Sequence, residues 1–358
     1  MGTPYAAQVE SKVARCHEVL GRTPLWAEPF TSSPEAFRNK AKLVIGGTRA
    51  EPTVGILDRA GAGVDLRHCG LYEPGLAEVV TQVPGLVSDL GLVPYDVGRR
   101  SGELKHVLVT HSPTGELMVR FVLRSPGQLG RIRRALPLLA RRLAGLRVVS
   151  VNLQPAHAAV LEGPEEVVLS EQQELPMPVN DVRLRLRTRS FFQTNTAVAA
   201  GLYRQARAWI DEVDPASVWD LYCGVGGFAL HTVTRPDGSA RSVLGVEASA
   251  EAVASARAAA AELPGEPTFL AGDVREHLAR EAAPDLVIVN PPRRGIGPDL
   301  AAWLERSDVE HVLYSSCNLT SLARDLTGMP SLTPVRSRLF DMFPQTEHLE
   351  VLTLLRRR

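Results

Sequence analysis

Hydrophobic and polar positions follow two different patterns along the chain, and the change lies near residue 185. In residues 6–20, apolar side chains recur at spacings of four, three and four, which predicts an amphipathic helix whose apolar stripe includes Cys16. Short apolar runs then alternate with turns rich in Gly and Pro, and a helical pattern at 129–144 interrupts them. The strands predicted in this half are Lys42–Ile45, Val54–Leu57, His106–Thr110, Leu117–Leu123 and Val148–Leu153. Residues 1–185 are therefore expected to form a smaller α+β domain.

From residue 194 the pattern becomes a repeat of strand and helix. After a helix at 194–213, five apolar runs are each followed by a helical segment, as in a doubly wound parallel sheet. These runs are Val218–Tyr222, Ser242–Glu247, Pro267–Leu270, Asp285–Val289 and His311–Ser315. Two final runs, at 337–340 and 349–355, are close enough in sequence to form an antiparallel pair. Residues 186–358 are therefore expected to form an α/β, Rossmann-like domain.

Composition adds a few constraints. The 358 residues, 44% of them hydrophobic, are enough for two domains that each have a core. No apolar run approaches the roughly 20 residues that span a bilayer, and residues 1–20 lack the apolar centre of a signal peptide, so we expect a cytoplasmic protein. The four cysteines, Cys16, Cys69, Cys223 and Cys317, include no C-x-x-C pair, which argues against a disulfide framework and a zinc ribbon.

Charge is balanced overall and uneven locally. Lys plus Arg and Asp plus Glu number 40 each, so the net charge does not indicate a nucleic-acid partner. Residues 98–147, however, hold eleven basic and two acidic side chains, a local net charge of +9. Four arginines alternate with other residues on a predicted strand: Arg183, Arg185, Arg187 and Arg189. Either stretch alone is compatible with a solvated sheet edge, whereas two in the same half favour contacts with phosphates.

One glycine-rich turn has the form of a nucleotide-binding loop. The apolar run 217–221 leads into Tyr222 and three glycines, Gly224, Gly226 and Gly227, before a helical segment. A strand, a tight glycine loop and a helix N-terminus in this order bind nucleotide-like ligands, because the backbone approaches the ligand closely where no Cβ intervenes. A plain connection between strand and helix is the alternative for such a turn taken alone.

Polar side chains follow the next strands of the predicted sheet, at the edge where open α/β sheets bind ligands. Glu247 ends the second strand, 23 residues after Gly224, and is suited to accept hydrogen bonds from ribose hydroxyls. Asp273 follows the third strand. Asn290 and two prolines follow the fourth, in a stiff loop whose two arginines, Arg293 and Arg294, are suited to hold a flat base.

One thiol follows the fifth strand, and one acid stands at the start of the last apolar run. Cys317 lies at the turn between the fifth strand and a helix, where backbone amides and the helix dipole favour a thiolate. A buried structural thiol is the alternative. Glu350 begins a strongly apolar strand, where desolvation is expected to raise its pKa towards that of a general base. The alternative for Glu350 is a surface acid at the start of a strand.

Five segments together resemble the RNA (uracil-C5)-methyltransferases, which use S-adenosylmethionine. They are Phe191–Asn195, Asp220–Phe228, Asn290–Gly297, Ser315–Asn318 and Phe340–Glu350. Within that family the chain is similar to the shorter type of bacterial 23S rRNA enzyme, which adds segments 37–42 and 99–105. Thirty-six residues precede the first of these, too few for the extra OB-type domain of the longer type. The tRNA branch is less similar at 191–195 and 290–297.

The resemblance implies a Rossmann-like methyltransferase domain preceded by an α+β RNA-recognition domain, acting as a monomer on 23S rRNA or, alternatively, on tRNA. It implies that Cys317 is the nucleophile and that Glu350 is the base that removes the C5 proton. The cofactor contacts that it implies are Gln193, Tyr222, Glu247 and Asn290, to which the glycine loop and the strand ends add Gly224 and Asp273. The RNA-binding residues are expected to be Arg38, Lys40, Arg293 and Arg294. The target uridine is expected to flip out of its stack to reach the thiol.

Relatives in this family also carry a [4Fe-4S] cluster on four cysteines, three near the N-terminus and one just before a Leu-Tyr pair. Cys69, which precedes Gly70, Leu71 and Tyr72, matches the fourth. The other three have no counterpart, because Cys16 lies on the stripe of the first predicted helix. The sequence therefore predicts that the chain as given holds no stable cluster, either because it begins downstream of those cysteines or because the cluster has been lost.

Two other classes of function share part of this pattern. An amino-methyltransferase acting on adenine or glutamine would also use Asn-Pro-Pro, but it needs an aromatic residue next, where this chain has Arg293. A catalytically silent RNA-binding protein would keep the basic first half and would have no use for Cys317 and Glu350.

Overall fold

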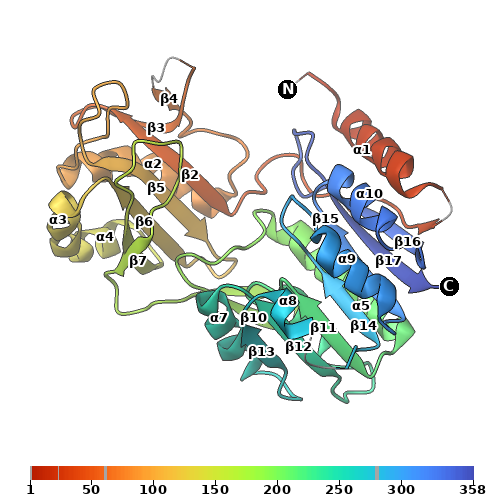
Figure 1. Ribbon diagram of the computed structural model, residues 1–358. Helices are drawn as coiled ribbons and strands as arrows, with labels where there is room; N and C mark the ends of the chain where they lie inside the picture. The colour runs from red at the N-terminus through yellow and green to blue at the C-terminus, as the bar shows by residue number, and fades with distance from the viewer. Residues whose placement is uncertain (1, 23, 60–62, 279–281) are drawn as a thin grey trace. The chain divides into compact units, whose positions relative to one another are not determined.

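The computed structural model describes residues 2–22, 24–59, 63–278 and 282–358, and the chain forms two compact units (Figure 1). The first unit joins Met1–Pro34 to Pro178–Arg358 and is called the Rossmann-like unit below. The second, Glu35–Met177, is called the inserted unit because it lies between those two stretches of sequence.

The Rossmann-like unit is built on an eight-stranded sheet of order β1-β16-β17-β15-β14-β11-β12-β13. Its strands are β1 (Leu25–Trp26), β11 (Ser217–Leu221), β12 (Ser242–Glu247), β13 (Thr268–Ala271), β14 (Leu286–Val289), β15 (His311–Ser316), β16 (Leu332–Phe340) and β17 (Glu350–Arg357). Strands β11 to β15 pair in parallel, and β17 runs antiparallel between β15 and β16. The predicted doubly wound sheet and its final antiparallel pair are confirmed. The chain winds in opposite directions from β11, so the carboxyl ends of β11 and β14 border the crevice at which such sheets bind ligands.

Helices cover this sheet and supply the other half of its core. They are α1 (Tyr5–Leu20), α5 (Thr196–Val213), α6 (Gly227–Thr232), α7 (Ala250–Ala260), α8 (Val274–Leu278), α9 (Gly297–Arg306) and α10 (Leu319–Thr327). Leu300 of α9 and Leu322 of α10 pack with Val287 and Val312 of the sheet, all at most 1% exposed. A two-stranded sheet of β9 (Leu175–Val179) and β10 (Val182–Leu186) precedes α5.

The N-terminal segment belongs to the Rossmann-like unit, which differs from the predicted division into 1–185 and 186–358. Strand β1 adds to the sheet in parallel beside β16, and helix α1 packs on α10 and β16. Lys12 of α1 forms a buried ion pair with Asp341 at 2.6 Å, and the predicted packing of Cys16 is confirmed by its 0% exposure. These long-range contacts have no signal in the local pattern of residues 1–34.

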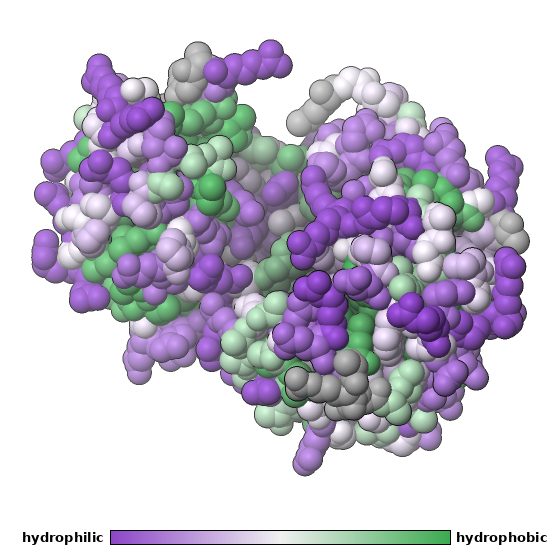
Figure 2. All heavy atoms as spheres, viewed as in Figure 1, coloured by the Kyte–Doolittle hydropathy of each residue, from purple (hydrophilic) through white to green (hydrophobic). Residues whose placement is uncertain are grey.

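Hydrophilic residues cover most of the face seen in Figure 2, with smaller hydrophobic patches between them. Among the described residues, no helix is long and apolar enough to cross a membrane.

The inserted unit is a seven-stranded sheet of order β4-β3-β2-β5-β6-β7-β8 with its helices packed on one face. Its strands are β2 (Lys40–Gly47), β3 (Pro52–Leu57), β4 (Gly63–Asp65), β5 (Leu104–His111), β6 (Leu117–Leu123), β7 (Leu146–Leu153) and β8 (Glu165–Val168). Its helices are α2 (Pro74–Asp89), η1 (Pro126–Gln128), α3 (Leu129–Arg134) and α4 (Leu136–Arg142). The expected α+β class is confirmed for this unit.

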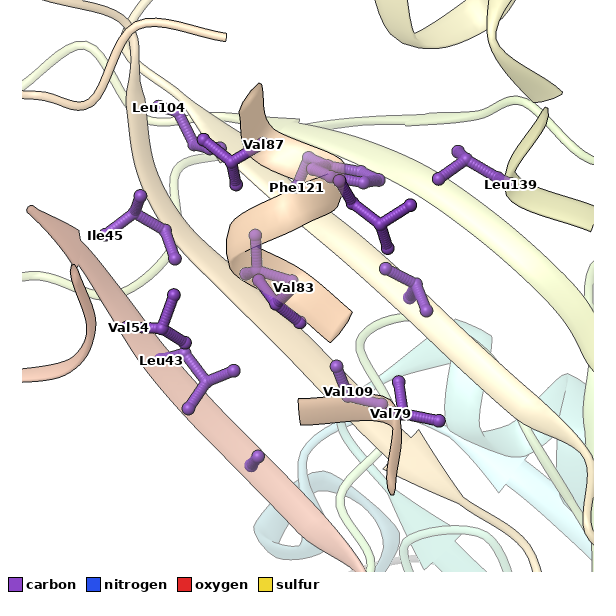
Figure 3. Close-up of a cluster of buried hydrophobic side chains, with 14 of the residues drawn as sticks. Leu43, Ile45, Val54, Val79, Val83, Val87, Leu104, Val109, Phe121 and Leu139 are labelled. Atoms are coloured by element: carbon purple, nitrogen blue, oxygen red, sulfur yellow. The ribbon is translucent and has the colours of Figure 1, made fainter. Parts of the chain in front are cut away.

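Helix α2 is an element that the sequence analysis missed. It runs through Pro84, and an interior proline costs a helix about 3 kcal/mol. Figure 3 shows Val79, Val83 and Val87 of this helix facing the sheet, where they are at most 6% exposed. Burial of each valine contributes about 1.5–3 kcal/mol, so packing outweighs the cost of the proline.

The helix predicted at 129–144 is two helices. The break lies at Ala135, between α3 and α4, because Pro137 in the first turn of α4 has no N–H to continue the ladder of α3.

Several basic side chains of the stretch 98–147 are paired with acids, and one of them is buried. Arg120 is 2% exposed, and its guanidinium donates to both Glu162 and Glu166. Three more ion pairs join Arg124 to Glu103, Arg142 to Asp89 and Arg147 to Glu116. Glu162, Glu166 and Asp89 lie outside the stretch and neutralise part of its local charge of +9, in which Glu103 and Glu116 are already counted.

The alternating arginines are only partly on a strand, since β10 ends at Leu186. Its apolar side chains are buried as predicted, and Arg183 is exposed. Arg185, however, forms an ion pair with Glu262, which further reduces the charge available to phosphates.

Candidate active site

The turn after β11 contains residues in the left-handed backbone region. Gly224 and Gly226 have φ of +55° and +85°, and Tyr222 has φ of +69° without glycine's freedom. A Cβ on Gly227 would lie 2.4 Å from the hydroxyl of Tyr203, so α6 packs against α5 only with glycine there. The predicted glycine loop is therefore present, and a strained residue such as Tyr222 is characteristic of ligand sites.

Asp220 lies beneath this loop with its side chain fully buried. One carboxylate oxygen accepts a hydrogen bond of 2.9 Å from the N–H of Ala229, and the other has no partner among the described residues. Burial raises the pKa of Asp220 to about 7. A buried acceptor with one unpaired oxygen fits a cofactor that brings a donor, as the amino group of S-adenosylmethionine does.

A cavity of about 850 Å³ opens at the carboxyl edge of the sheet. Tyr222, Asp273 and Arg294 are among its lining residues, and so is Ala248, which directly follows Glu247. The Arg275 guanidinium donates to Asp273 at 2.7 Å and holds the pKa of Asp273 at about 2, so this carboxylate is charged at neutral pH. The volume is in the range of cofactor pockets.

The remaining predicted cofactor residues lie near the ends of other elements. The carboxylate of Glu247 accepts hydrogen bonds from the backbone N–H of Gly224 at 3.2 Å and of Ser249 at 2.9 Å, which ties it to the glycine loop. Gln193 is buried in the loop before α5. Asn290 follows β14 and lies close to the predicted base, since its amide nitrogen donates to Oε1 of Glu350 at 3.1 Å.

Sheet pairing brings the two predicted catalytic residues together. Strands β15 and β17 are antiparallel, with Ser316 opposite Val351. Cys317 directly follows Ser316 and Glu350 directly precedes Val351, and the Glu350 carboxylate is near enough to raise the pKa of the Cys317 thiol. The thiol and the carboxylate are therefore neighbours at the same edge as the cofactor cavity, although they are far apart in sequence.

Glu350 is 2% exposed and is held by two donors on one oxygen. Asn290 donates at 3.1 Å, and the hydroxyl of Ser315 donates to the same Oε1 atom. Burial raises the pKa of Glu350 to about 7, although these two hydrogen bonds oppose the rise. The predicted rise in pKa is confirmed. Ser315 had no predicted role, but it lies two residues before Cys317 on a strand, a spacing that puts both side chains on one face.

Cys317 differs from the expectation of a stabilised thiolate. Desolvation raises the pKa of the Cys317 thiol, and the nearby Glu350 raises it further, while Arg293 opposes them. The side chain of Asn318 caps α10, the helix that follows Cys317. The free protein therefore holds Cys317 as a thiol.

The two arginines of the loop after β14 are both exposed. Arg294 lines the cavity, whereas a guanidinium nitrogen of Arg293 lies 3.3 Å from Nε2 of His348, in the segment before β17. The backbone of this loop is held by two hydrogen bonds. The Asn318 side chain donates to the carbonyl of Arg293 at 2.8 Å, and the Arg324 guanidinium donates to the carbonyl of Arg294. This loop therefore carries two cations on a fixed backbone beside Cys317.

The other two predicted RNA-binding residues are in the inserted unit. Arg38 forms an isolated β-bridge with Tyr72. Lys40 begins β2, and burial together with the charge of Arg120 lowers its pKa to about 8.

The four thiols do not fit a four-cysteine cluster. Cys69 is in the inserted unit. Within the Rossmann-like unit, Cys16 is packed in the core and Cys223 and Cys317 are in two separate site loops, so these three described thiols do not converge. Over residues 2–22, 24–59, 63–278 and 282–358, no three His, Cys, Asp or Glu side chains form a group that could hold a metal ion.

Comparison with known proteins decides the family. The chain is 46% identical over 362 residues to the 23S rRNA (uracil(747)-C(5))-methyltransferase RlmC of Halothiobacillus neapolitanus, covering 99% of this chain and 95% of that protein. The protein of the same name from Pectobacterium atrosepticum is 45% identical over 99% of this chain and 95% of its own length. The chain belongs to the RNA (uracil-C5)-methyltransferase family. The family model described as tRNA (Uracil-5-)-methyltransferase matches residues 278–358, the part of the methyltransferase that holds Cys317 and Glu350.

Two further matches support the methyltransferase fold. The family model described as Methyltransferase small domain matches residues 207–305. The crystal structure of the Pyrococcus abyssi tRNA (uracil-54, C5)-methyltransferase in complex with S-adenosyl-L-homocysteine superposes with a TM-score of 0.81, covering 98% of this chain and 83% of that one. Its sequence is 24% identical, so this likeness concerns the fold alone.

Proposed function

We propose that this chain methylates C5 of one uridine in 23S rRNA, with S-adenosylmethionine as the methyl donor. The observation that carries the proposal is the pairing of β15 with β17, which sets the Cys317 thiol beside the Glu350 carboxylate at the ligand edge of a methyltransferase sheet. Relatives 45–46% identical over 99% of the chain are named for this reaction on 23S rRNA.

Cys317 is proposed to act first, as the nucleophile. Carbon C5 of uracil is a weak nucleophile, and addition of a thiolate to C6 converts it into an enolate-like carbon with the negative charge on O4. The raised pKa of Cys317 means that the free enzyme holds a thiol. This thiol loses its proton to solvent, and the sulfur then forms the bond to C6. Arg293, the cation that opposes this rise, favours the thiolate.

The methyl group comes from the sulfonium of bound S-adenosylmethionine. Asp220, Glu247 and Asp273 are proposed to hold that cofactor by its amino group, ribose and base respectively, with Tyr222, Gly224 and Gln193 around it. The family resemblance implies cofactor contacts for Gln193, Tyr222, Glu247 and Asn290. Gly224 and Asp273 are assigned by their positions at strand ends, and Asp220 by its burial beneath the glycine loop beside the cavity.

Glu350 is proposed to complete the reaction as general base. It takes the proton from C5, the bond between C6 and the sulfur of Cys317 breaks, and the C5–C6 double bond and the thiolate are restored. A pKa of about 7 suits this task, because the carboxylate is substantially ionised at neutral pH and is still a useful base. Ser315 and Asn290 orient the carboxylate by holding Oε1.

The RNA is proposed to contact both units. The uridine has to leave its stack to reach Cys317, and Arg293 and Arg294 would hold the extruded nucleotide or its phosphate. Arg38 and Lys40 are assigned to the RNA by the family resemblance. We place the enzyme in the cytoplasm as a monomer.

Mapping of 5-methyluridine in rRNA and tRNA, from cells with and without the intact gene, tests the proposal. We expect one 23S rRNA uridine to lose its methyl group and to regain it with the wild-type chain but not with Cys317→Ala. Loss of the mark from tRNA instead would favour the tRNA alternative. Rescue by Cys317→Ala would favour a silent RNA-binding protein.

A further inference from the structure

The inserted unit has a cavity of its own. It has a volume of about 510 Å³ and is lined by Val44 of β2, Lys105 and His106 of β5, and Tyr95, His157 and Val160 of two loops. Leu43 and Ile45 point into the core beneath the helices, so Val44 between them lies on the opposite face of the sheet. The cavity is therefore on the face without helices.

The loop that carries Tyr95 is tightly constrained. Asp96 and Ser101 exchange two backbone hydrogen bonds of 2.8 and 3.3 Å. Gly102 has φ of +94°, and a Cβ there would lie 2.0 Å from the carbonyl oxygen of Pro94, so the position requires glycine. This loop runs into the segment 99–105, which the family resemblance includes. None of its residues takes part in the methyl-transfer steps proposed above.

Two rings and a cation meet in this cavity. The hydroxyl of Tyr95 lies 2.9 Å from Nδ1 of His157, and the two ring centroids are 6.2 Å apart. The ammonium of Lys105 lies 4.7 Å from the centre of the Tyr95 ring and donates to the carbonyl of Ala156 at 2.7 Å. A bulge between residues 104 and 106 turns Lys105 towards this face. Fixed, partly exposed rings of this kind are surfaces on which unstacked bases lie.

His106 provides hydrogen-bonding capacity on the cavity wall. Its Nδ1 atom is buried and has no partner among the described residues. Desolvation lowers the pKa of His106 to about 4, so the imidazole is neutral and offers one donor and one acceptor. This Nδ1 atom has almost no accessible surface, so a ligand in the cavity meets the remainder of the neutral ring, which forms part of the wall.

The rest of the cavity is apolar with basic side chains beside it. Val97 and Val160 are 41% and 53% exposed, unusually open for valine, and hydrophobic residues gather near β3 and β4 in Figure 2. Arg99 and Arg100 follow on the Tyr95 loop, and the exposed Lys42 lies two residues before Val44 on β2. Apolar walls, a polar edge and neighbouring cations match a base with its flanking phosphates.

We propose that this cavity binds one unstacked nucleobase of the RNA substrate, a base other than the uridine that is methylated. The base lies against Tyr95 and His157 with one edge on His106, and its phosphates contact Arg99, Arg100 or Lys42. The cavity thereby adds RNA affinity and selects the sequence or the loop structure around the target. This inference rests on the proposed function, which supplies the RNA.

The test is the steady-state kinetics of the full chain on a transcript of the methylated 23S rRNA segment. Tyr95→Ala is expected to raise the KM for RNA roughly 5- to 150-fold, the value of one base stacked on an aromatic ring, with kcat within about twofold of wild type. Tyr95→Phe, which keeps the ring, is expected to stay within about threefold. Affinity for S-adenosylmethionine, measured by calorimetry, stays the same in each variant.

A second substitution tests the cavity independently if Tyr95→Ala does not fold. Val160→Asp changes an exposed side chain at the cavity and is expected to raise the KM for RNA as well, because a carboxylate repels phosphates. Thr81→Ala is the matched control, on the exposed surface of α2 in the same unit, where the hydroxyl donates to the carbonyl of Glu78 at 2.7 Å.

An unchanged KM in both Tyr95→Ala and Val160→Asp, with wild-type methylation intact, overturns the base-binding cavity and leaves the proposed function standing. Absence of methylation of any rRNA transcript by the wild type overturns the proposed function instead. As an independent readout, RNA carrying 4-thiouridine beside the target is expected to crosslink to the peptides containing Tyr95 or His157. Crosslinks confined to peptides of the Rossmann-like unit would count against the cavity.

Discussion

Replacement of Glu350 by glutamine separates the addition step from the elimination step. Glutamine has the same shape, and its Oε1 atom keeps the hydrogen bonds from Asn290 and Ser315, so the side chain stays in place. What it loses is the ability to take the C5 proton. General-base catalysis is worth roughly 10²- to 10⁴-fold, so turnover is expected to fall by that factor while Cys317 still adds to C6.

The expected result is an enzyme that remains covalently joined to methylated RNA. The assay mixes Glu350→Gln with end-labelled RNA and tritiated S-adenosylmethionine, and resolves the products on a denaturing gel. A slowly migrating band that carries both labels is expected, in an amount approaching that of the enzyme. The double variant Cys317→Ala with Glu350→Gln is the control and gives no band.

The same substitution has a predicted effect on stability. A rise in the pKa of Glu350 from 4.5 to about 7 corresponds to about 3 kcal/mol of unfavourable free energy for the buried carboxylate. The folded state binds more protons than the unfolded state between these two pH values, so wild-type stability falls as the pH rises through this window. The unfolding free energy of Glu350→Gln relative to wild type is expected to increase from about pH 4.5 and to level off above about pH 7.

Urea unfolding at a series of pH values measures this difference, and the fold of the variant is checked at the same time. A folded Glu350→Gln variant that binds S-adenosylmethionine but forms no adduct would refute the assignment of Glu350 as the C5 base. A stability difference that does not change with pH would refute the raised pKa.

Three further predictions concern other parts of the chain. Cys317→Ala is expected to abolish methyl transfer and to bind S-adenosylmethionine as the wild type does; activity within about tenfold of wild type would contradict its role as nucleophile. Lys12→Met removes the cation that pairs with the buried carboxylate of Asp341, and it is expected to lower the free energy of unfolding, measured in urea, by about 3–5 kcal/mol. The double variant Lys12→Met with Asp341→Asn, which has no buried charge at this site, should recover much of that stability. The chain as given is expected to bind less than one four-iron cluster per molecule after anaerobic reconstitution, and stoichiometric iron and sulfide would show that expectation to be wrong.

Local pattern was enough to identify most of the Rossmann-like sheet. A strand buried on both faces and followed by a helix has a strong periodicity, so β11 to β15 could be located from sequence. The positions of Glu247, Asp273 and Asn290 at strand ends then follow, because parallel strands bring their carboxyl ends to one edge. The pair proposed to react, Cys317 and Glu350, was also recognisable, since both occur in segments that resemble one family.

Tertiary structure alone decided the features that depend on distant contacts. Residues 1–34 join the Rossmann-like unit through a parallel strand and the Lys12–Asp341 pair, and neither has a local signal. Helix α2 survives its internal proline because the sheet buries its valines.

The balance of charges is likewise a property of the folded chain. Sequence showed a basic stretch, but folding brings Glu162 and Glu166 to Arg120 and removes that guanidinium from the surface. Sequence placed Cys317 at a helix start that favours thiolate, whereas folding buries the thiol and sets the Glu350 carboxylate near it, and both raise the pKa of Cys317. The types of side chain available for chemistry are local information, while their protonation depends on burial and on neighbours that only the tertiary structure supplies.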